Sequence, residues 1–158
     1  MEKILSREKL KKEIDRLKAG GKKIVFTNGC FDILHVGHTR YLKEARKLGD
    51  VLVVALNSDA SVRAIKGEKR PLVPEAERAE VLASLGAVDY VTIFHEETPL
   101  KVITLFQPDI IVKGGDWAEG KVVGRDAVRA WGGRVEIVPE IKGASTTNIV
   151  EKIRKNYT

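Results

Sequence analysis

The chain has 158 residues, a formal net charge of +6 at pH 7 and 43% hydrophobic residues. A domain of this length buries roughly two-thirds of the surface of its unfolded chain, so we expect one domain with a substantial core and no second one. The single cysteine, Cys30, excludes an intramolecular disulfide, and no apolar run approaches the ~20 residues that span a bilayer. These features favour a cytoplasmic protein without a membrane partner.

Strand and helix patterns alternate along the sequence. Leu10, Ile14 and Leu17 recur at helical spacing within 7–19, which predicts an amphipathic N-terminal helix ended by two glycines. Short, apolar and β-branched segments, typical of buried parallel strands, follow at 23–27, 51–56, 88–94, 109–112 and 135–138. Helical patterns between and after them cover 39–48, 75–85, 99–106, 125–131 and 146–155.

This alternation predicts the α/β class: a Rossmann-like, doubly wound parallel sheet of about five strands with right-handed crossovers. We expect a single domain over 1–158, with an N-terminal helix in 1–21 and the core in 22–158. Ligands of such sheets bind at the carboxyl ends of the strands, near the change in strand order. The longest irregular segment is predicted at 58–74, where a binding loop and a solvated connection are equally compatible with the sequence.

The most informative segment follows the first strand and ends in His35-Val36-Gly37-His38. A strand that runs into a glycine-bearing bend and then a helix places backbone N–H groups where phosphate binds. Two imidazoles three residues apart share one helix face, and histidine donates strong hydrogen bonds to phosphate oxygen. Two ordinary histidines at a helix start are the alternative, but the surrounding motif favours a nucleotide-binding turn.

Two further segments could contact phosphate. Lys113 and Gly114 follow the fourth predicted strand, where a glycine permits close backbone approach and a lysine can reach an anion. Three hydroxyl residues, Ser145, Thr146 and Thr147, open the last predicted helix. One such residue would suffice as a helix cap, so three offer additional donors at the positive helix end.

For other polar residues, the sequence is equally compatible with a structural role. Arg78 reads as a surface charge, and Asn57 could belong to an Asx-type turn. The carboxylates of Asp32 and Asp116 could serve magnesium or a hydroxyl group, or could only stabilise turns, and spacing does not distinguish these roles. No His and Cys residues have zinc-ligand spacing, so no metal ligand is assigned. The basic residues are spread along helices, which favours phosphorylated small molecules over nucleic acid.

Six motifs occur in one order between residues 23 and 153: F-T-N-G-C-F-D-I-L-H-V-G-H, L-N-S-D, K-G-E-K-R-P, E-R, V-K-G-G-D and S-T-T-N-I. The chain therefore resembles the heptose 1-phosphate adenylyltransferase family, which belongs to the HxGH type of nucleotidyltransferase. The resemblance implies AMP transfer from ATP to D-glycero-β-D-manno-heptose 1-phosphate. The products would be pyrophosphate and ADP-heptose for the lipopolysaccharide inner core. Mg²⁺ is the implied cofactor, used with ATP, and a homodimer is the implied assembly.

The resemblance also implies residue roles. His35, His38 and Lys66 would be catalytic. Nucleotide binding would fall to Thr27, Asn28, Gly29, Phe31, Asp32, Gly37, Asn57, Arg70, Arg78, Lys113, Gly114, Asp116, Ser145, Thr146 and Thr147. Within this set, the serine and the two threonines near the C-terminus would bind the β and γ phosphates, and Lys66 and Arg70 would cover the reacting phosphates.

Three alternatives stand beside this interpretation. Glycerol-3-phosphate cytidylyltransferase shares the superfamily motif and carries Asp-Trp, as at Asp116-Trp117, where heptose enzymes often have Asp-Tyr. The segments Asn28-Gly29-Cys30 and Lys113-Gly114-Gly115 fit the heptose group better. A non-catalytic nucleotide-binding protein is disfavoured by the intact histidine motif. A DNA-binding module is suggested only by the positive charge, without a helix-turn-helix pattern.

Overall fold

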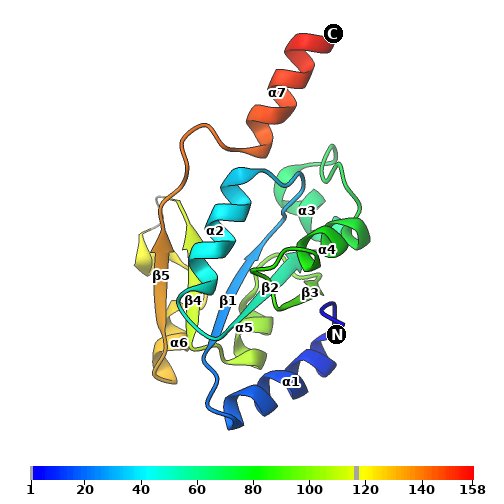
Figure 1. Cartoon of the computed structure of the whole chain (residues 1–158). Coiled ribbons are helices and arrows are strands. Elements are labelled where there is room, and N and C mark those ends of the chain that lie inside the picture. The colour runs from blue at the N-terminus through cyan, green and yellow to red at the C-terminus, as the bar shows by residue number, and fades with distance from the viewer. Residues whose placement is uncertain (1, 116–117) are drawn as a thin grey trace.

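The computed structural model describes residues 2–115 and 118–158, which form one parallel sheet with helices on both faces (Figure 1). The strands are β1 (Ile24–Gly29), β2 (Val51–Asn57), β3 (Tyr90–Phe94), β4 (Ile110–Gly114) and β5 (Arg134–Val138). The helices are α1 (Arg7–Ala19), α2 (Val36–Arg46), α3 (Asp59–Lys66), α4 (Glu75–Ala83), α5 (Leu100–Phe106), α6 (Arg125–Ala130) and α7 (Thr146–Tyr157), with a 3₁₀ turn η1 (Glu119–Lys121).

The sheet has the strand order β3-β2-β1-β4-β5, and every neighbouring pair is parallel. The chain moves outward from β1 to β3, then returns to the other side of β1 for β4 and β5. This reversal places a topological switch point between β1 and β4, where ligands of doubly wound sheets bind. The predicted Rossmann-like fold with five parallel strands is confirmed.

The core consists of two apolar layers separated by the sheet. Ile24 and Phe26 of β1 belong to one layer, and Val25 belongs to the other, as the alternation of a strand requires. Helices α1, α5 and α6 pack on the first layer, whereas α2 and α4 pack on the second (Figure 1). Helix α2 leads directly out of β1, so its first turn lies at the switch point.

The N-terminal segment is part of this domain. Leu10 and Ile14 of α1 are fully buried, and the Tyr90 hydroxyl donates to Glu13 Oε1 at 2.8 Å. Ahead of α1, the backbone pairs with β3, since the N–H of Leu5 donates to the Val91 carbonyl at 3.0 Å. The N-terminal segment therefore covers the edge of β3, which limits pairing with other chains.

The irregular segment predicted at 58–74 is half helical, so that prediction is wrong for its first part. Helix α3 occupies 59–66, capped by Ser58, whose Oγ accepts from the N–H of Ser61 at 3.2 Å. Val62 of this helix is buried. The eight residues of α3 make only about two helical turns, too few for the periodicity to identify a helix, although the Ser58-Asp59 start is a capping pattern.

Helix α7 projects away from the sheet, at the end of the molecule opposite α1 (Figure 1). All of its residues are at least partly exposed, including Ile153 and Tyr157. Its first turn is joined to the rest of the domain by a hydrogen bond from Thr146 Oγ1 to the carbonyl of Ile33 at 3.1 Å. Within residues 2–115 and 118–158, the longest and most apolar helices still fall short of what a membrane span requires.

Candidate active site

A cavity of about 1130 Å³ opens at the carboxyl ends of the strands, between α2, α3 and the start of α7. It brings together most of the residues predicted from the sequence: Asn28, Gly29, Phe31, Asp32, His35, Gly37, His38, Asn57, Lys66, Arg70, Lys113, Gly114, Ser145, Thr146 and Thr147. Thr27 and Arg78 are buried beside this cavity and do not line it. Asp116 and its neighbour Trp117 lie outside the described residues.

The two histidines stack at the start of α2, with ring centroids 3.9 Å apart. His35 is the N-cap, and its Nδ1 accepts from the N–H of Gly37 at 3.1 Å. The backbone N–H of His35 donates to Nδ1 of His38 at 3.4 Å. Because both Nδ1 atoms accept hydrogen bonds, each neutral ring carries its proton on Nε2, where it is available to a ligand.

Burial keeps both rings neutral. Desolvation lowers the pKa of His38 to about 4, with a smaller contribution from the charge of His35. Desolvation also lowers the pKa of His35. At pH 7 the pair therefore acts as two neutral hydrogen-bond donors, and a bound polyphosphate would shift both pKa values upward by favouring the charged form.

Gly37 allows the histidine turn and the start of α7 to meet. A Cβ at this position would lie 2.8 Å from Cε1 of His35 and 3.0 Å from Cβ of Ala144. Any side chain here would thus push the imidazole from its cap and separate the two segments. The predicted phosphate residues of α7 reach the site because this contact is close.

The hydroxyl groups at the start of α7 stabilise the fold and can also donate to a ligand. Ser145 Oγ caps the helix by accepting from the N–H of Asn148 at 3.0 Å, which leaves its hydroxyl hydrogen able to donate. Thr146 Oγ1 donates to the carbonyl of Ile33. The first-turn amides of α7 face the same end of the cavity and add the positive helix terminus to it.

Arg78 is not a surface charge, which corrects the expectation from sequence. The residue is 1% exposed, and its guanidinium donates to the carbonyls of Val73, Cys30 and Asn57 at 2.8, 2.7 and 2.9 Å. It also pairs with Asp59 at 2.7 Å. Charged residues in the first turn of a helix are usually solvated, so the local pattern contains no sign of burial. Arg78 joins the ends of β1 and β2 to the segment before α4.

Asp32 takes the turn-stabilising role of the two that the sequence left open. Its carboxylate accepts from the N–H groups of Leu72 and Val73 at 2.9 Å, and Arg70 Nη1 lies 3.4 Å from Oδ2. The Asp32 side chain is only 6% exposed. Asp32 therefore fastens the loop after α3 over the cavity and directs Arg70 toward it.

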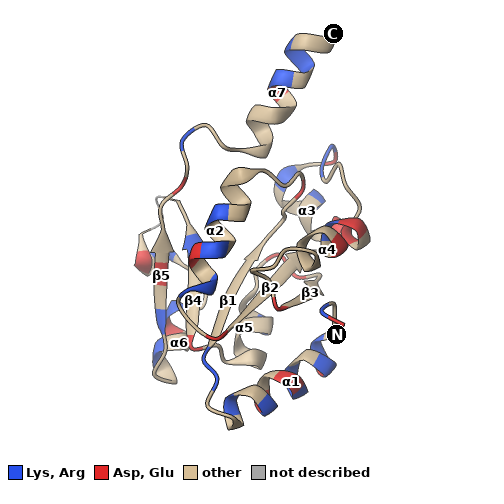
Figure 2. Ribbon diagram, in the orientation of Figure 1, with Lys and Arg blue, Asp and Glu red and all other residues tan. Residues whose placement is uncertain are grey.

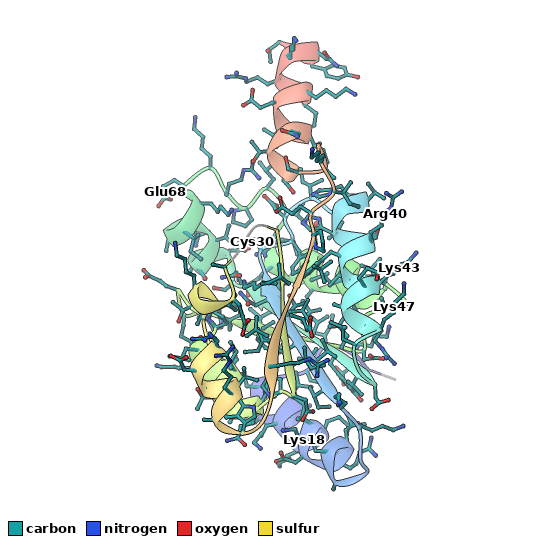
Figure 3. All side chains as sticks on the ribbon, turned by 90° about the vertical axis from the view of Figure 1, so that its left-hand side faces the viewer. Lys18, Cys30, Arg40, Lys43, Lys47 and Glu68 are labelled. Atoms are coloured by element: carbon teal, nitrogen blue, oxygen red, sulfur yellow. The ribbon has the colours of Figure 1, made fainter. Side chains whose placement is uncertain are left out.

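Three further polar groups line the floor and rim. Lys113 is half-buried at the end of β4, and burial lowers its pKa. Lys66, the last residue of α3, is exposed. Cys30 lies between α2 and α3 (Figure 3), and burial raises the pKa of its thiol. Cys30 is consequently protonated at pH 7 and is a poor nucleophile.

Tyr41 is a site residue that sequence reasoning missed. Its hydroxyl lies 2.6 Å from Thr27 Oγ1 and donates to the carbonyl of Val112 at 2.9 Å, which connects α2 to β1 and β4 across the switch point. A Cβ on Gly114 would lie 3.3 Å from the Tyr41 ring. Tyr41 follows His38 by three residues, so helical spacing alone could have placed both on one face.

Sequence reasoning also missed the outer rim. Arg40, Lys43 and Lys47 line the cavity from α2, and their side chains extend along its outer side (Figure 3). Figure 2 shows this basic stretch on α2 and, on the same face of the sheet, a strongly acidic α4. The opposite rim is formed by the segment between β5 and α7, including Pro139 and Ile141. A row at i, i+3 and i+7 is the periodic signal that would have identified the basic rim.

The cavity fits a metal ion that arrives with phosphate. Among residues 2–115 and 118–158, no three His, Cys, Asp or Glu side chains form a group that could hold a metal. The Asp32 carboxylate is already occupied by backbone N–H groups. Mg²⁺ commonly keeps water and phosphate ligands and takes few from protein, so this donor set is compatible with it.

Comparisons with known proteins find relatives over most of this chain. Residues 26–153 match the family model described as cytidylyltransferase-like. The bifunctional protein HldE of Geobacter metallireducens is 60% identical over 91% of this chain and 29% of its own length. That of Trichlorobacter lovleyi is 54% identical over 99% of this chain and 32% of its own length. The chain thus spans about a third of the length of these curated relatives.

Two solved structures are also similar. The crystal structure of the lipopolysaccharide core biosynthesis protein from Thermoplasma volcanium has a TM-score of 0.65 and 36% identity, covering 78% of this chain and 100% of that one. Pantothenate synthetase from Thermus thermophilus has a TM-score of 0.62, covering 98% of this chain and 70% of that one. At 17% identity, the second likeness concerns the fold alone.

Proposed function

This chain belongs to the cytidylyltransferase-like family, and from that premise we propose that it transfers AMP from ATP to D-glycero-β-D-manno-heptose 1-phosphate. The reaction releases pyrophosphate and gives ADP-heptose for the lipopolysaccharide inner core. One observation carries the proposal: a single cavity joins the stacked histidines, the cationic loop after α3 and the positive end of α7. These are the groups that a triphosphate and an attacking phosphate require.

The choice of ATP and heptose rests on two kinds of support. The HldE relatives and the lipopolysaccharide core biosynthesis protein are similar over most of this chain. The segments Asn28-Gly29-Cys30 and Lys113-Gly114-Gly115, which fit the heptose group, both contribute to the cavity. Glycerol-3-phosphate cytidylyltransferase activity is the outcome that a test of substrates must exclude.

The chemistry needs no covalent intermediate. A phosphate oxygen of the sugar phosphate attacks the α-phosphorus in line, the bond from that phosphorus to the β-phosphate oxygen breaks, and pyrophosphate leaves with the electron pair. His35 and His38 donate from Nε2 to oxygens of the α-phosphate, where charge develops. Lys66 and Arg70 reduce the repulsion between the two anions.

The leaving group lies toward α7. Ser145 and Thr147 donate to the β and γ phosphates, together with the first amides of the helix. Lys113 and Gly114 line the side of the base and ribose, a role that Asp116 would share. Arg78 and Thr27 support the site without contacting the nucleotide, because their side-chain hydrogen bonds go to other protein groups. Arg78 binds backbone carbonyls and Asp59, and Thr27 binds the Tyr41 hydroxyl.

Mg²⁺ held by the phosphates of ATP would neutralise part of their charge. The substrates of this reaction belong to the cytoplasm, and we place the protein there. We also propose a homodimer, which the molar mass of the purified protein from light scattering would test. A monomer at micromolar concentration would refute that assembly.

Pyrophosphate release tests the proposed function. The purified protein with Mg²⁺ is given ATP or CTP, each with heptose 1-phosphate or glycerol 3-phosphate, and pyrophosphate is measured over time. We expect release with ATP and heptose 1-phosphate alone. Release with CTP and glycerol 3-phosphate would identify the cytidylyltransferase instead, and no release with any pair would contradict both the proposed acceptor and the proposed catalysis.

A further inference from the structure

The cavity extends beyond the histidine turn to the carboxyl ends of β2 and β3. Val62, Ile65 and Lys66 of α3 line this extension on one side, and Glu97, Thr98 and Pro99 of the β3–α5 connection line it on the other. These six residues define what we call the β3 arm. In the sheet order β3-β2-β1-β4, three strand spacings of about 4.8 Å separate the ends of β3 and β4, so the arm lies roughly 14 Å from the base side.

We propose that the β3 arm binds the hydroxylated end of the acceptor sugar, with Glu97 and Thr98 as its polar contacts and Arg7 as the residue that positions them. The proposal rests on the proposed function, since it assigns the acceptor side of that same site. Of the described residues, those lining the base side and the leaving-group side belong to β4, the β5–α7 segment and α7. The β3 arm is a part of the cavity that a nucleotide in that position leaves open.

The chemistry of the arm suits a polyol. A carboxylate accepts hydrogen bonds from sugar hydroxyls, and both Glu97 and Thr98 are exposed at the cavity. Ile65, which is 49% exposed, offers an apolar surface to the C–H face of a sugar ring. The negative charge of Glu97 repels phosphate, so the acceptor is oriented with its phosphate toward Lys66 and its hydroxyls toward Glu97.

Asn28 gives a second, independent indication. Its side-chain oxygen is buried, and among the described residues it accepts no hydrogen bond, although the residue lines the cavity at the end of β1. A buried acceptor without a donor is unfavourable. Rotation of this amide toward the cavity would let a sugar hydroxyl supply the missing donor at the junction between the phosphates and the β3 arm.

The connection that carries Glu97 is held from two sides. Arg7 of α1 binds Glu96 in a bidentate pair at 2.7 and 2.6 Å, and this contact lowers the pKa of Glu96 to about 2. On the other side, Ser61 Oγ donates to the carbonyl of Glu96 at 3.0 Å and accepts from Asn57 Nδ2 at 2.9 Å. Residues 97 and 98 follow directly, so the N-terminal helix fixes one wall of the arm.

Steady-state kinetics of Glu97→Gln test the arm, with Glu80→Gln on the exposed side of α4 as the matched control. We expect the KM for heptose 1-phosphate to rise about tenfold in Glu97→Gln, while the KM for ATP stays within twofold of wild type. The preference for heptose 1-phosphate over mannose 1-phosphate, which lacks the seventh carbon, should also fall. Glu80→Gln should leave all three values unchanged.

The outcomes separate the two proposals. If wild type releases no pyrophosphate with ATP and heptose 1-phosphate, the proposed function fails and the arm fails with it. If wild type is active and Glu97→Gln matches Glu80→Gln, only the β3 arm is overturned.

Arg7 is tested as a positioning residue through a conservative pair of variants. Arg7→Met should raise the KM for heptose 1-phosphate about fivefold with the KM for ATP unchanged, and Arg7→Lys should restore part of that loss. Thermal unfolding of both variants checks that α1 stays docked. Equal loss of affinity for both substrates, or no loss in a folded Arg7→Met protein, would overturn the positioning role.

Discussion

The two walls of the cavity are built in opposite ways. The histidine turn on one side is held by hydrogen bonds between residues two or three positions apart in the sequence, such as the bond from the Gly37 N–H to His35. The loop after α3 on the other side is held by Asp32 and Arg78, whose partners in Leu72 and Cys30 lie 40 and 48 residues away. The first wall is encoded locally, and the second forms only when the whole sheet has folded.

We expect this difference to separate residues that determine turnover from residues that determine stability. Changes in the histidine turn should affect turnover in a folded protein, because the hydrogen bonds of His35 and His38 stay within the turn. Changes at Arg78 or Asp32 should affect stability first, because each side chain satisfies backbone groups from distant segments. Variants of the two walls, taken from the largest expected effect to the smallest, test this division.

Arg78→Met should lower the free energy of unfolding by about 3–5 kcal/mol, since it leaves Asp59 and three backbone carbonyls without their donor. Urea unfolding measures the change. Arg63→Met, an exposed arginine on α3, is the control and should stay within about 0.5 kcal/mol of wild type. A change no greater than the control would show that the Arg78 contacts do not stabilise the fold.

His38→Ala should reduce kcat about 10²–10³-fold, because one preorganised donor to the α-phosphate is lost. Circular dichroism and the melting temperature should stay near wild type. His95→Ala removes an exposed histidine outside the cavity and should leave turnover unchanged. A folded His38→Ala protein with normal kcat would remove His38 from the mechanism.

Asp32→Ala should cost about 1–3 kcal/mol of stability, because the N–H groups of Leu72 and Val73 lose their acceptor. The released loop should also be cut faster by trypsin after the exposed Lys69. Asp126→Asn, whose side chain is 94% exposed, serves as the control. Cleavage at the wild-type rate would contradict the fastening role of Asp32.

The free energy of unfolding should fall as the pH drops from 6.5 to 5. The pKa of His38 is about 4 in the folded protein and 6.5 when unperturbed, so the unfolded chain takes up the proton first and is favoured at lower pH. This range lies above the acid transitions of Glu13 and Glu96, whose pKa values are about 2. Urea unfolding of His38→Gln should show a weaker pH dependence than that of wild type. An equal pH dependence in the two proteins would show that a group other than His38 causes the effect.

The fold and the histidine turn could be read from sequence because their signals are local. Short apolar strands alternating with helices predicted the sheet, and the H-x-G-H motif placed both imidazoles at the start of α2. The structure adds their tautomers and lowered pKa values, which depend on burial and on the hydrogen bonds of Gly37 and His35.

The second wall could not be read in the same way. Arg78 has the sequence context of a solvated helix start, and nothing in the chain pattern indicates that the ends of β1 and β2 converge on it. Helix α3 is too short for a periodic signal, and Glu97 becomes a cavity residue only because α3 and the β3–α5 connection face each other. These properties come from tertiary contacts, which a one-dimensional pattern does not contain.

The central claim is that the AMP part of ATP, and not its γ-phosphate, is transferred to the sugar phosphate. The most direct test supplies ATP labelled at the α-phosphorus, in a parallel reaction ATP labelled at the γ-phosphorus, and heptose 1-phosphate in both. We predict that the α label appears in ADP-heptose and the γ label in pyrophosphate. Transfer of the γ label to the sugar phosphate, or retention of both labels in ATP by the folded protein, would contradict the account.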